Sequence, residues 1–166
     1  MIYPACKKST PIACQREGSS SKVNEVFKVH CGIGYLMGSS SGNQSNAFTV
    51  TSRTCAVGNL SFAHELGHNM GSAHNPENGG GGTYSYSYGH WINGVFRTVM
   101  SYSNPCSSGC TRRAYFSNPS VTYNGYATGT SSRDNARSIN NTDTSILGDG
   151  KKPSAIQTIV CCGLSR

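Results

Sequence analysis

Charged side chains are scarce in this sequence, and long apolar runs are absent from it. Only 13% of its 166 residues are Asp, Glu, Lys or Arg. Disordered chains combine high net charge with low hydrophobicity, so this composition indicates a folded chain. No segment is apolar enough to span a membrane, and residues 1–29 lack the apolar stretch of a signal peptide. We expect a domain with no membrane partner, and a chain whose start is incomplete or misassigned.

Acidic residues are especially few, with 7 Asp and Glu against 14 Lys and Arg. The resulting net charge of +7 could indicate nucleic-acid binding. The basic residues are scattered, however, and their longest clusters are pairs such as Lys7–Lys8 and Lys151–Lys152. No nucleic-acid-binding motif accompanies them, so we expect a basic soluble surface and no nucleic-acid partner.

The spacing C-x-x-C is also missing, although the chain has eight cysteines. Paired C-x-x-C spacings are the signature of a thiolate metal cluster, so disulfides in an oxidising compartment are the better explanation. We expect them above all for Cys31, Cys55, Cys106 and Cys110. Three N-x-S/T sequons also fit a secreted, extracellular protein.

Local patterns predict a loop-rich fold with short strands. Alternating and β-branched residues predict strands at 23–29, 31–37 and 47–51. Residues 75–98, which contain a glycine run, are expected to be mostly irregular. No internal repeat is present.

Two helices are expected. The first begins at a cap on Asn59 or Ser61 and runs to about Met70, where glycine ends it. The second begins at a cap on Ser131 or Ser132 and stops at a glycine. Its residues at helical spacing are Ala136, Ile139, Asp143 and Ile146.

The segment HELGHNMGSAH, residues 64–74, carries the chemistry. Residues four apart lie on one face of a helix, so His64 and His68 can bind one metal ion. Gly71 can take a positive φ and turn the chain, so that His74 supplies a third imidazole. Three neutral imidazoles leave one position of a zinc ion open to water, as in catalytic sites. We predict a Zn²⁺ cofactor on these three histidines.

Glu65 is expected to be the catalytic base. Bound zinc lowers the pKa of water from about 15.7 to roughly 7, and a neighbouring carboxylate can take the proton and pass it to the leaving amine. On the opposite face of the helix, Phe62, Leu66 and Met70 are expected to pack into a core. An alternative is that His64 and His68 are merely surface residues of an ordinary helix. That alternative would not explain why a glycine and a third histidine follow at the positions of the extended motif.

Two residues of the segment TVMSYS, residues 98–103, are further candidates. Met100 is expected to lie in a turn beneath the zinc and to support the site without binding the metal. Tyr102 can stabilise the developing oxyanion or approach the zinc, which would make it catalytic, and it can equally be a packed aromatic residue. His90, beside Trp91, is expected to be structural or exposed.

With these motifs, the chain resembles the metzincin superfamily of zinc metallopeptidases, whose signature is H-E-x-x-H-x-x-G-x-x-H followed by a Met-turn. It is most similar to the reprolysin (adamalysin)-like group, which includes bacterial peptidyl-Asp-type metallopeptidases. The resemblance runs from about Cys31 to Ile146. It implies an α+β, zincin-type catalytic domain over residues 31–148, with a small mixed sheet, an active-site helix and a C-terminal helix. Residues 1–30 and 149–166 stay unassigned, and the N-terminal part of the domain is expected to be missing.

The resemblance also implies disulfide pairs Cys31–Cys55 and Cys106–Cys110. Many reprolysins have Asp directly after the third histidine, where this chain has Asn75, and little loss is expected because that residue does not bind the metal.

A peptide substrate would lie as an added strand along residues 32–36. Its side-chain preference would come from residues 101–120. Arg112 and Arg113, in that stretch, would favour acidic side chains, although two arginines on a solvated loop are an equally good explanation.

The leading hypothesis is therefore a secreted zinc endopeptidase that acts on proteins or peptides with Glu65 as general base. The alternative is a truncated, non-catalytic metzincin-like zinc-binding module. A zinc hydrolase of non-peptide amides is a further rival, disfavoured by the substrate-aligning strand and the Met-turn. The sequence does not indicate an oligomeric state.

Overall fold

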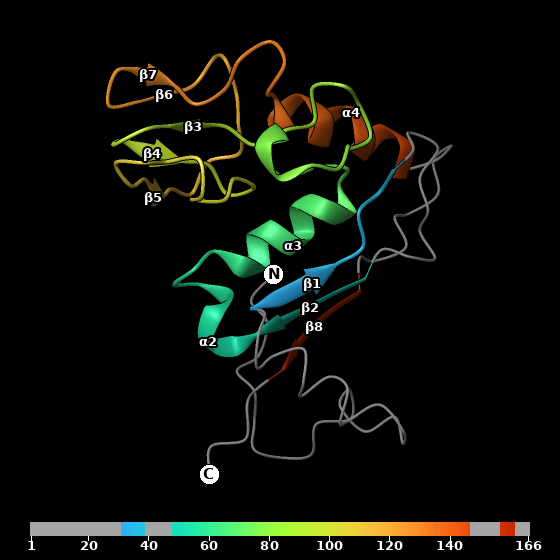
Figure 1. Cartoon of the computed structure of the whole chain (residues 1–166). Helices are drawn as coiled ribbons and strands as arrows, with labels where there is room; N and C mark the ends of the chain where they lie inside the picture. The colour runs from blue at the N-terminus through green and yellow to red at the C-terminus, as the bar shows by residue number, and fades with distance from the viewer. Residues whose placement is uncertain (1–30, 39–47, 147–156, 162–166) are drawn as a thin grey trace. The chain divides into compact units, whose positions relative to one another are not determined.

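The computed structural model describes residues 31–38, 48–146 and 157–161, and every structural statement below concerns those residues. The predicted strand at 23–29 lies outside them. Figure 1 shows short strands in small sheets together with a few helices. The described residues thus combine helices with small sheets, which is consistent with the α+β class expected from the sequence. None of the helices in the described ranges has the length and apolarity needed to cross a membrane.

The first sheet has three strands in the order β1-β2-β8. Strand β1 (Gly32–Gly34) is antiparallel to β2 (Phe48–Ser52), with Ile33 opposite Val50. Strand β8 (Gln157–Cys161) runs parallel to β2 on its other side. The sequence predicted β1 and β2, but it left the segment of β8 unassigned. Within the described sheet, β1 is an edge strand.

A disulfide between Cys31 and Cys55 joins the start of β1 to the short helix α2 (Arg53–Ala56). A second disulfide joins Cys106 to Cys110. Both pairings implied by the family resemblance are confirmed. The side chains of the other four cysteines lie outside those the structure describes.

Helix α3 (Ser61–Asn69) lies against the sheet. The side-chain amide of Asn69 donates hydrogen bonds to the carbonyls of Tyr35 and Phe48, at 2.8 and 3.1 Å. The helix ends as predicted, with Gly71 at a φ of +80°. The predicted cap at its start is wrong: the N-cap residue is Leu60, in the left-handed conformation at φ 56°, and it makes no side-chain cap bond.

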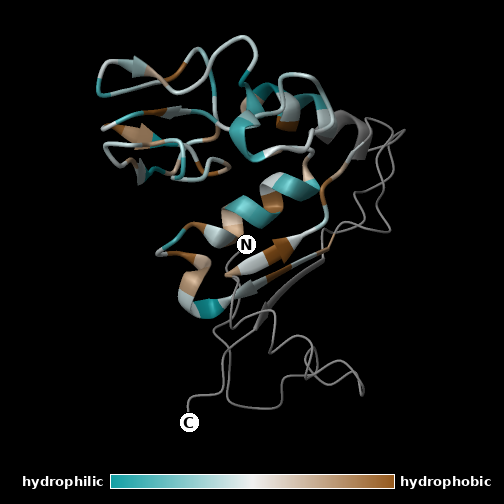
Figure 2. Cartoon of the chain, in the orientation of Figure 1, coloured by the Kyte–Doolittle hydropathy of each residue, from teal (hydrophilic) through white to brown (hydrophobic). Residues whose placement is uncertain are grey.

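The buried face of α3 is polar. His64, Glu65 and His68 are buried, whereas Phe62 is 37% exposed and Leu66 is only half-buried. The expectation that Phe62 packs into a core is therefore wrong. The physical reason is that the side of α3 carrying Glu65 and Gly67 faces β1 and Met100. Figure 2 shows that polar and apolar residues alternate along the helix.

Residues 76–127 form a 3₁₀ turn, η2 (Pro76–Asn78), and five two-residue strands. Strands β3 (Trp91–Ile92), β4 (Phe96–Arg97) and β5 (Thr111–Arg112) make one small sheet in that order. Strands β6 (Thr122–Tyr123) and β7 (Tyr126–Ala127) pair as a hairpin. The segment 75–98 is mostly irregular as predicted, apart from η2, β3 and β4.

Helix α4 (Asn135–Ile146) begins later than predicted. Asp134 accepts a hydrogen bond from the backbone N–H of Arg137 at 2.9 Å, so the cap is Asp134 and not Ser131 or Ser132. The buried residues of its described part are polar: Asn135, Ser138 and Thr142. The Ser138 hydroxyl lies 2.8 Å from that of Ser87, so hydrogen bonds join α4 to the rest of the fold.

Candidate metal centre

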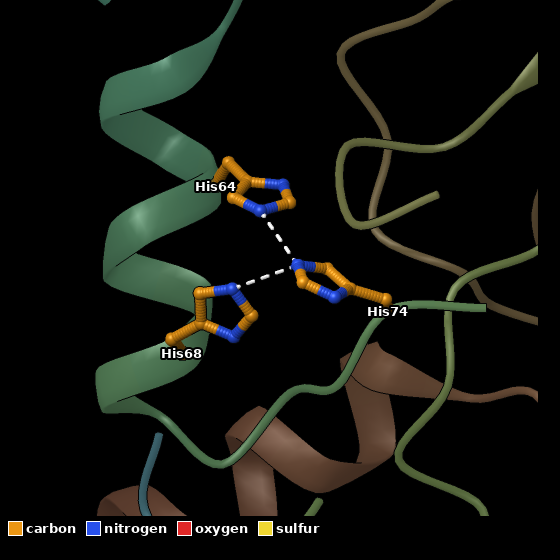
Figure 3. Close-up of side chains that lie close together, drawn as sticks. All are labelled: His64, His68 and His74. Carbon is orange, nitrogen blue, oxygen red and sulfur yellow. Dashed lines mark hydrogen bonds between the residues drawn. The ribbon is translucent and has the colours of Figure 1, made fainter. Parts of the chain in front are cut away.

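Three imidazoles converge beside helix α3. The Nε2 atom of His74 lies 3.1 Å from Nε2 of His64 and 3.1 Å from Nε2 of His68, and Figure 3 shows the three rings pointing toward a common centre. One ring nitrogen from each residue lies within 4.8 Å of the others. The helix supplies two rings and the turn after Gly71 supplies the third, which is the convergence that the spacing predicts.

Two backbone carbonyls orient the rings. The Nδ1–H of His64 donates to the carbonyl of Val99, and that of His68 donates to the carbonyl of Ser72, each at 2.9 Å. A neutral imidazole protonated on Nδ1 keeps its lone pair on Nε2, so both lone pairs face the common centre. Sequence reasoning could not find these partners, because every residue has a carbonyl and only the fold selects which one is used.

The environment keeps the imidazoles neutral. Burial, with a further contribution from neighbouring His68, lowers the pKa of His64 to about 3 and that of His74 to about 4. Burial also lowers the pKa of His68. Neutral imidazole is the form that binds metals.

The three nitrogens fit a metal ion. For zinc bound tetrahedrally at about 2.0–2.1 Å, two ligand nitrogens stand roughly 3.3 Å apart. The two observed separations of 3.1 Å are close to that value. Among the described residues the metal-binding group consists of three imidazoles, and three protein ligands with one open position are typical of catalytic zinc sites.

Glu65 lies beside this centre in a tight setting. It is 6% exposed, and burial raises its pKa to about 7, although nearby Arg112 opposes the shift. A Cβ atom added to Gly32 would stand 2.8 Å from both Cγ and Oε1 of Glu65. Glycine at position 32 therefore lets strand β1 approach the carboxylate without displacing it.

Met100 lies beneath helix α3. It is fully buried, and a Cβ atom built on Gly67 would come within 2.5 Å of its sulfur. Gly67 is in the middle of the helix, between His64 and His68. The thioether therefore packs directly against the backbone that carries two of the imidazoles.

Tyr102 lies against the rings of His64 and His74. Its ring centroid is 4.2 Å from that of His74, and the side chain is 39% exposed. Its backbone N–H donates to Oδ1 of the fully buried Asn75 at 2.9 Å. Burial and then the charge of Glu65 raise the pKa of the phenol, while Arg112 opposes them. The raised pKa keeps the phenol of Tyr102 protonated, so its hydroxyl can donate a hydrogen bond.

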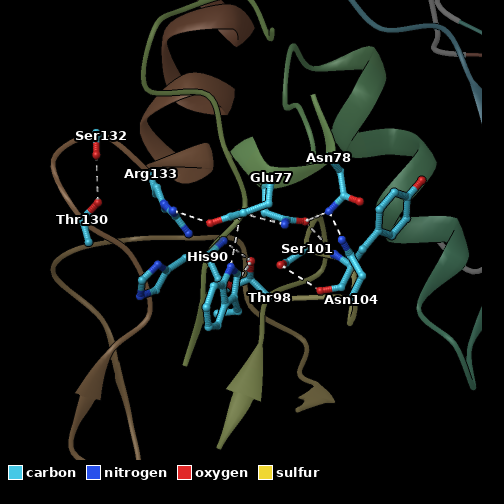
Figure 4. A network of polar contacts seen from close by, with 12 residues as sticks. Glu77, Asn78, His90, Thr98, Ser101, Asn104, Thr130, Ser132 and Arg133 are labelled. Carbon is cyan, nitrogen blue, oxygen red and sulfur yellow. Dashed lines mark hydrogen bonds and ion pairs between the residues drawn. The ribbon is translucent and has the colours of Figure 1, made fainter. Parts of the chain in front are cut away.

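A polar network holds the loop that follows His74 (Figure 4). Asn75 donates from Nδ2 to Glu77 at 2.8 Å, and Glu77 also accepts from Arg133 at 2.8 Å and from Trp91 at 3.3 Å. His90 is buried beside this network, where its backbone N–H donates to Thr98 Oγ1. Its place is structural, in agreement with one of the two expectations.

Arg97 and Arg112 lie near the site, and Arg113 follows Arg112 in the sequence; all three side chains are partly buried. Arg97 and Arg112 are opposite each other on the parallel strands β4 and β5. The guanidinium of Arg113 instead lies over the ring of Tyr123, 5.1 Å from its centroid. The solvated-loop explanation for Arg112 and Arg113 is therefore not supported.

The comparisons with known proteins point to a peptidase family. The model of the reprolysin-like metallo-peptidase family M12B matches residues 20–136. The chain is 39% identical over 124 residues to a peptidyl-Asp metalloendopeptidase of Stenotrophomonas maltophilia (strain R551-3) and 36% identical over 119 residues to one of Xanthomonas campestris pv. campestris. Each match covers 70% of this chain. A peptidyl-Asp metalloendopeptidase of Pseudomonas fragi is 33% identical over 88 residues.

The relatives are longer proteins. The chain spans 28% and 27% of the first two and 60% of the third, while 52% of the chain is covered in that last match. No solved structure is a significant match to the chain.

Proposed function

The chain belongs to the reprolysin-like metallo-peptidase family M12B, and from that premise we propose that it is a zinc-dependent endopeptidase that hydrolyses bonds within proteins or peptides. The observation that carries the proposal is the convergence of three neutral imidazoles next to a buried carboxylate. His64, His68 and His74 would hold the zinc ion, in a metzincin-like domain over residues 31–148, to whose first sheet strand β8 also belongs.

The roles of the site residues follow from their chemistry. Zinc, when bound, would supply a Lewis acid that polarises the scissile carbonyl and acidifies water. The Glu65 carboxylate would accept the proton of the attacking water and deliver it to the leaving amine nitrogen, a task suited to a pKa of about 7. The Tyr102 hydroxyl would donate a hydrogen bond to the oxyanion that develops from the carbonyl. Met100 would support the helix without binding the metal.

The substrate would be an extended peptide that pairs with the edge strand β1, which lies against Glu65. The relatives are named peptidyl-Asp metalloendopeptidases, and we extend a preference for acidic side chains to this chain. Two disulfides between described cysteines suit an oxidising compartment, so we propose that the protein acts outside the cell.

The test replaces Glu65 by Gln, which keeps the size of the side chain and removes its basicity. We expect Glu65→Gln to bind one zinc ion per chain, measured by atomic absorption, and to cleave an unfolded protein at least about 100-fold more slowly than the wild type. His68→Gln is the matched control, because it should lose zinc and cleavage together. A wild-type chain that holds zinc and cleaves no peptide would show a non-catalytic zinc-binding module instead.

A further inference from the structure

Two arginines beside the candidate metal centre form no salt bridge with any of the described residues. The backbone register of β4 and β5 places Arg97 directly opposite Arg112, so both side chains leave the same face of the sheet. Like charges at opposite positions destabilise a sheet. The salt bridge found among the described side chains joins Arg133 to Glu77, and neither Arg97 nor Arg112 takes part in one. This pairing of like charges needs an explanation.

Backbone carbonyls hold both guanidinium groups in place. Arg97 donates from Nη1 to the carbonyl of Ser101 at 2.6 Å, and Arg112 donates from Nη1 to the carbonyl of Asn59 at 2.9 Å. The Nε atoms of both are buried without a hydrogen-bond partner, as is that of Arg113, so Nε does not distinguish the pair. A guanidinium has five N–H donors in a rigid fork that suits a carboxylate. Each arginine is thus oriented in advance by one Nη1 hydrogen bond, and its other Nη N–H groups are the donors left for a substrate.

The pair lies next to the site of the proposed chemistry. Arg112 is close enough to act electrostatically on Glu65, Tyr102 and His74, and on Arg97 as well. The carbonyl that anchors Arg97 belongs to Ser101, between the buried Met100 and Tyr102. The carbonyl that anchors Arg112 lies just before helix α3. A peptide with its scissile bond at Glu65 would therefore bring neighbouring side chains near this pair.

Arg113 does not share this position, although it is the sequence neighbour of Arg112. Its guanidinium lies over Tyr123, and its backbone N–H donates to the carbonyl of Arg97 at 2.9 Å. The charge beside the site is therefore supplied from two neighbouring strands and not from two consecutive residues.

We propose that Arg97 and Arg112 together bind the carboxylate of an acidic substrate side chain next to the scissile bond, and that this pair sets the cleavage preference. The inference rests on the proposed endopeptidase function and deepens it. A carboxylate between the two guanidinium groups would relieve their mutual repulsion and accept hydrogen bonds from both. Substrates with Asn or Gln at that position would leave the two charges unpaired.

The test uses fluorogenic peptides that differ only in having Asp or Asn beside the scissile bond. For the wild type, we expect a kcat/KM that is roughly tenfold to hundredfold higher for the Asp peptide. Arg97→Gln and Arg112→Gln should each bring the Asp/Asn ratio toward one, and Arg113→Gln is the matched control that should keep it. The ratio separates recognition from a folding defect, because a folding defect lowers both rates equally.

If a Gln variant fails to fold, the corresponding Lys variant takes its place. Arg97→Lys and Arg112→Lys keep the positive charge and lose the planar fork of donors, so we expect an Asp/Asn ratio between that of the wild type and one. An Asp/Asn ratio that is unchanged in both arginine variants overturns the inference, as does a wild type that cleaves both peptides equally. In the latter case the endopeptidase function still stands.

If the zinc-loaded wild type cleaves no peptide, the proposed endopeptidase function fails. The role of the arginine pair is then tested by measuring peptide binding. The anisotropy of labelled Asp and Asn peptides on zinc-loaded Glu65→Gln protein measures it. The inference is supported if this protein binds the Asp peptide more tightly than the Asn peptide and if adding Arg112→Gln abolishes the difference. Equal binding of the two peptides overturns it.

Discussion

At the scale of single residues, the missing side chain of Gly67 makes room for Met100. Alanine is normally favoured over glycine inside a helix by up to about 1 kcal/mol. Here a Cβ atom would stand 2.5 Å from the Met100 sulfur and 2.9 Å from a ring carbon of Phe116. We therefore expect Gly67→Ala to lower the free energy of unfolding by about 1–3 kcal/mol, measured by urea denaturation.

Gly81 offers the control for that change, since a Cβ atom there would meet only the Tyr88 hydroxyl oxygen, at 3.9 Å. Gly81→Ala should leave stability unchanged or raise it by less than about 1 kcal/mol. A Gly67→Ala variant as stable as the wild type would show that Met100 does not press on the helix.

At the scale of elements, the disulfide Cys31–Cys55 joins β1 to α2 across a sequence separation of 24, whereas Cys106–Cys110 closes a separation of 4. Constraining the longer loop removes more entropy from the unfolded chain. We expect the double variant Cys31→Ala/Cys55→Ala to lose about 3 kcal/mol of unfolding free energy and Cys106→Ala/Cys110→Ala about 2 kcal/mol. Denaturant unfolding of the two double variants measures this order, and a larger loss from the short loop would contradict it.

The positions of helices and strands could be predicted where a pattern of neighbouring residues indicates them. The spacing of residues 64–74 predicted the helix, its end at Gly71 and the convergence of three imidazoles. Other features depend on contacts between distant segments, and the sequence does not show them. The left-handed Leu60 before α3 and the cap at Asp134 are two of these. A polar interior is the third, because an amphipathic pattern assumes that the apolar side of a helix faces inward.

In the candidate site, too, some residues could be predicted from local motifs and others are brought in only by contacts between distant segments. The three converging histidines and Glu65 follow from a motif, and the sequence also indicated Met100 and Tyr102. The carbonyl of Val99 and the side chain of Arg97 could not be anticipated, because only strand register and the turn after β4 bring them to the site. Periodicity identifies the residues of one element, whereas register between elements decides which neighbours they meet.

At the scale of the whole molecule, Glu77 joins the loop after His74 to Arg133, which is 56 positions away in the chain. Partial burial alone would raise the pKa of Glu77, but hydrogen bonds from Asn75, its own backbone, Arg133 and Trp91 outweigh it and lower that pKa to about 2. The folded-state pKa is thus below the ordinary value of 4.5. The ionised carboxylate therefore stabilises the fold above about pH 4.5, and this contribution is lost as the pH falls toward 2.

We expect Glu77→Gln to be less stable than the wild type near pH 6, with the difference shrinking as the pH falls below 4.5. Unfolding free energies of both proteins between pH 6 and 3 measure this. Parallel pH profiles of wild type and variant would mean that the contacts of Glu77 do not distinguish its two protonation states.

The three converging imidazoles come from one short stretch of chain, with His64 and His74 only ten positions apart. Closing so short a loop costs little conformational entropy. The carbonyl that orients His64, by contrast, is 35 positions away. The presence of the three donor nitrogens therefore depends on a short local segment, whereas the orientation of the His64 ring depends on the folding of a distant one. Loss of the distant packing would leave three tethered imidazoles still able to meet one ion, but with rings free to rotate. Substitutions far from the stretch would then weaken the hold on a metal without removing a single donor.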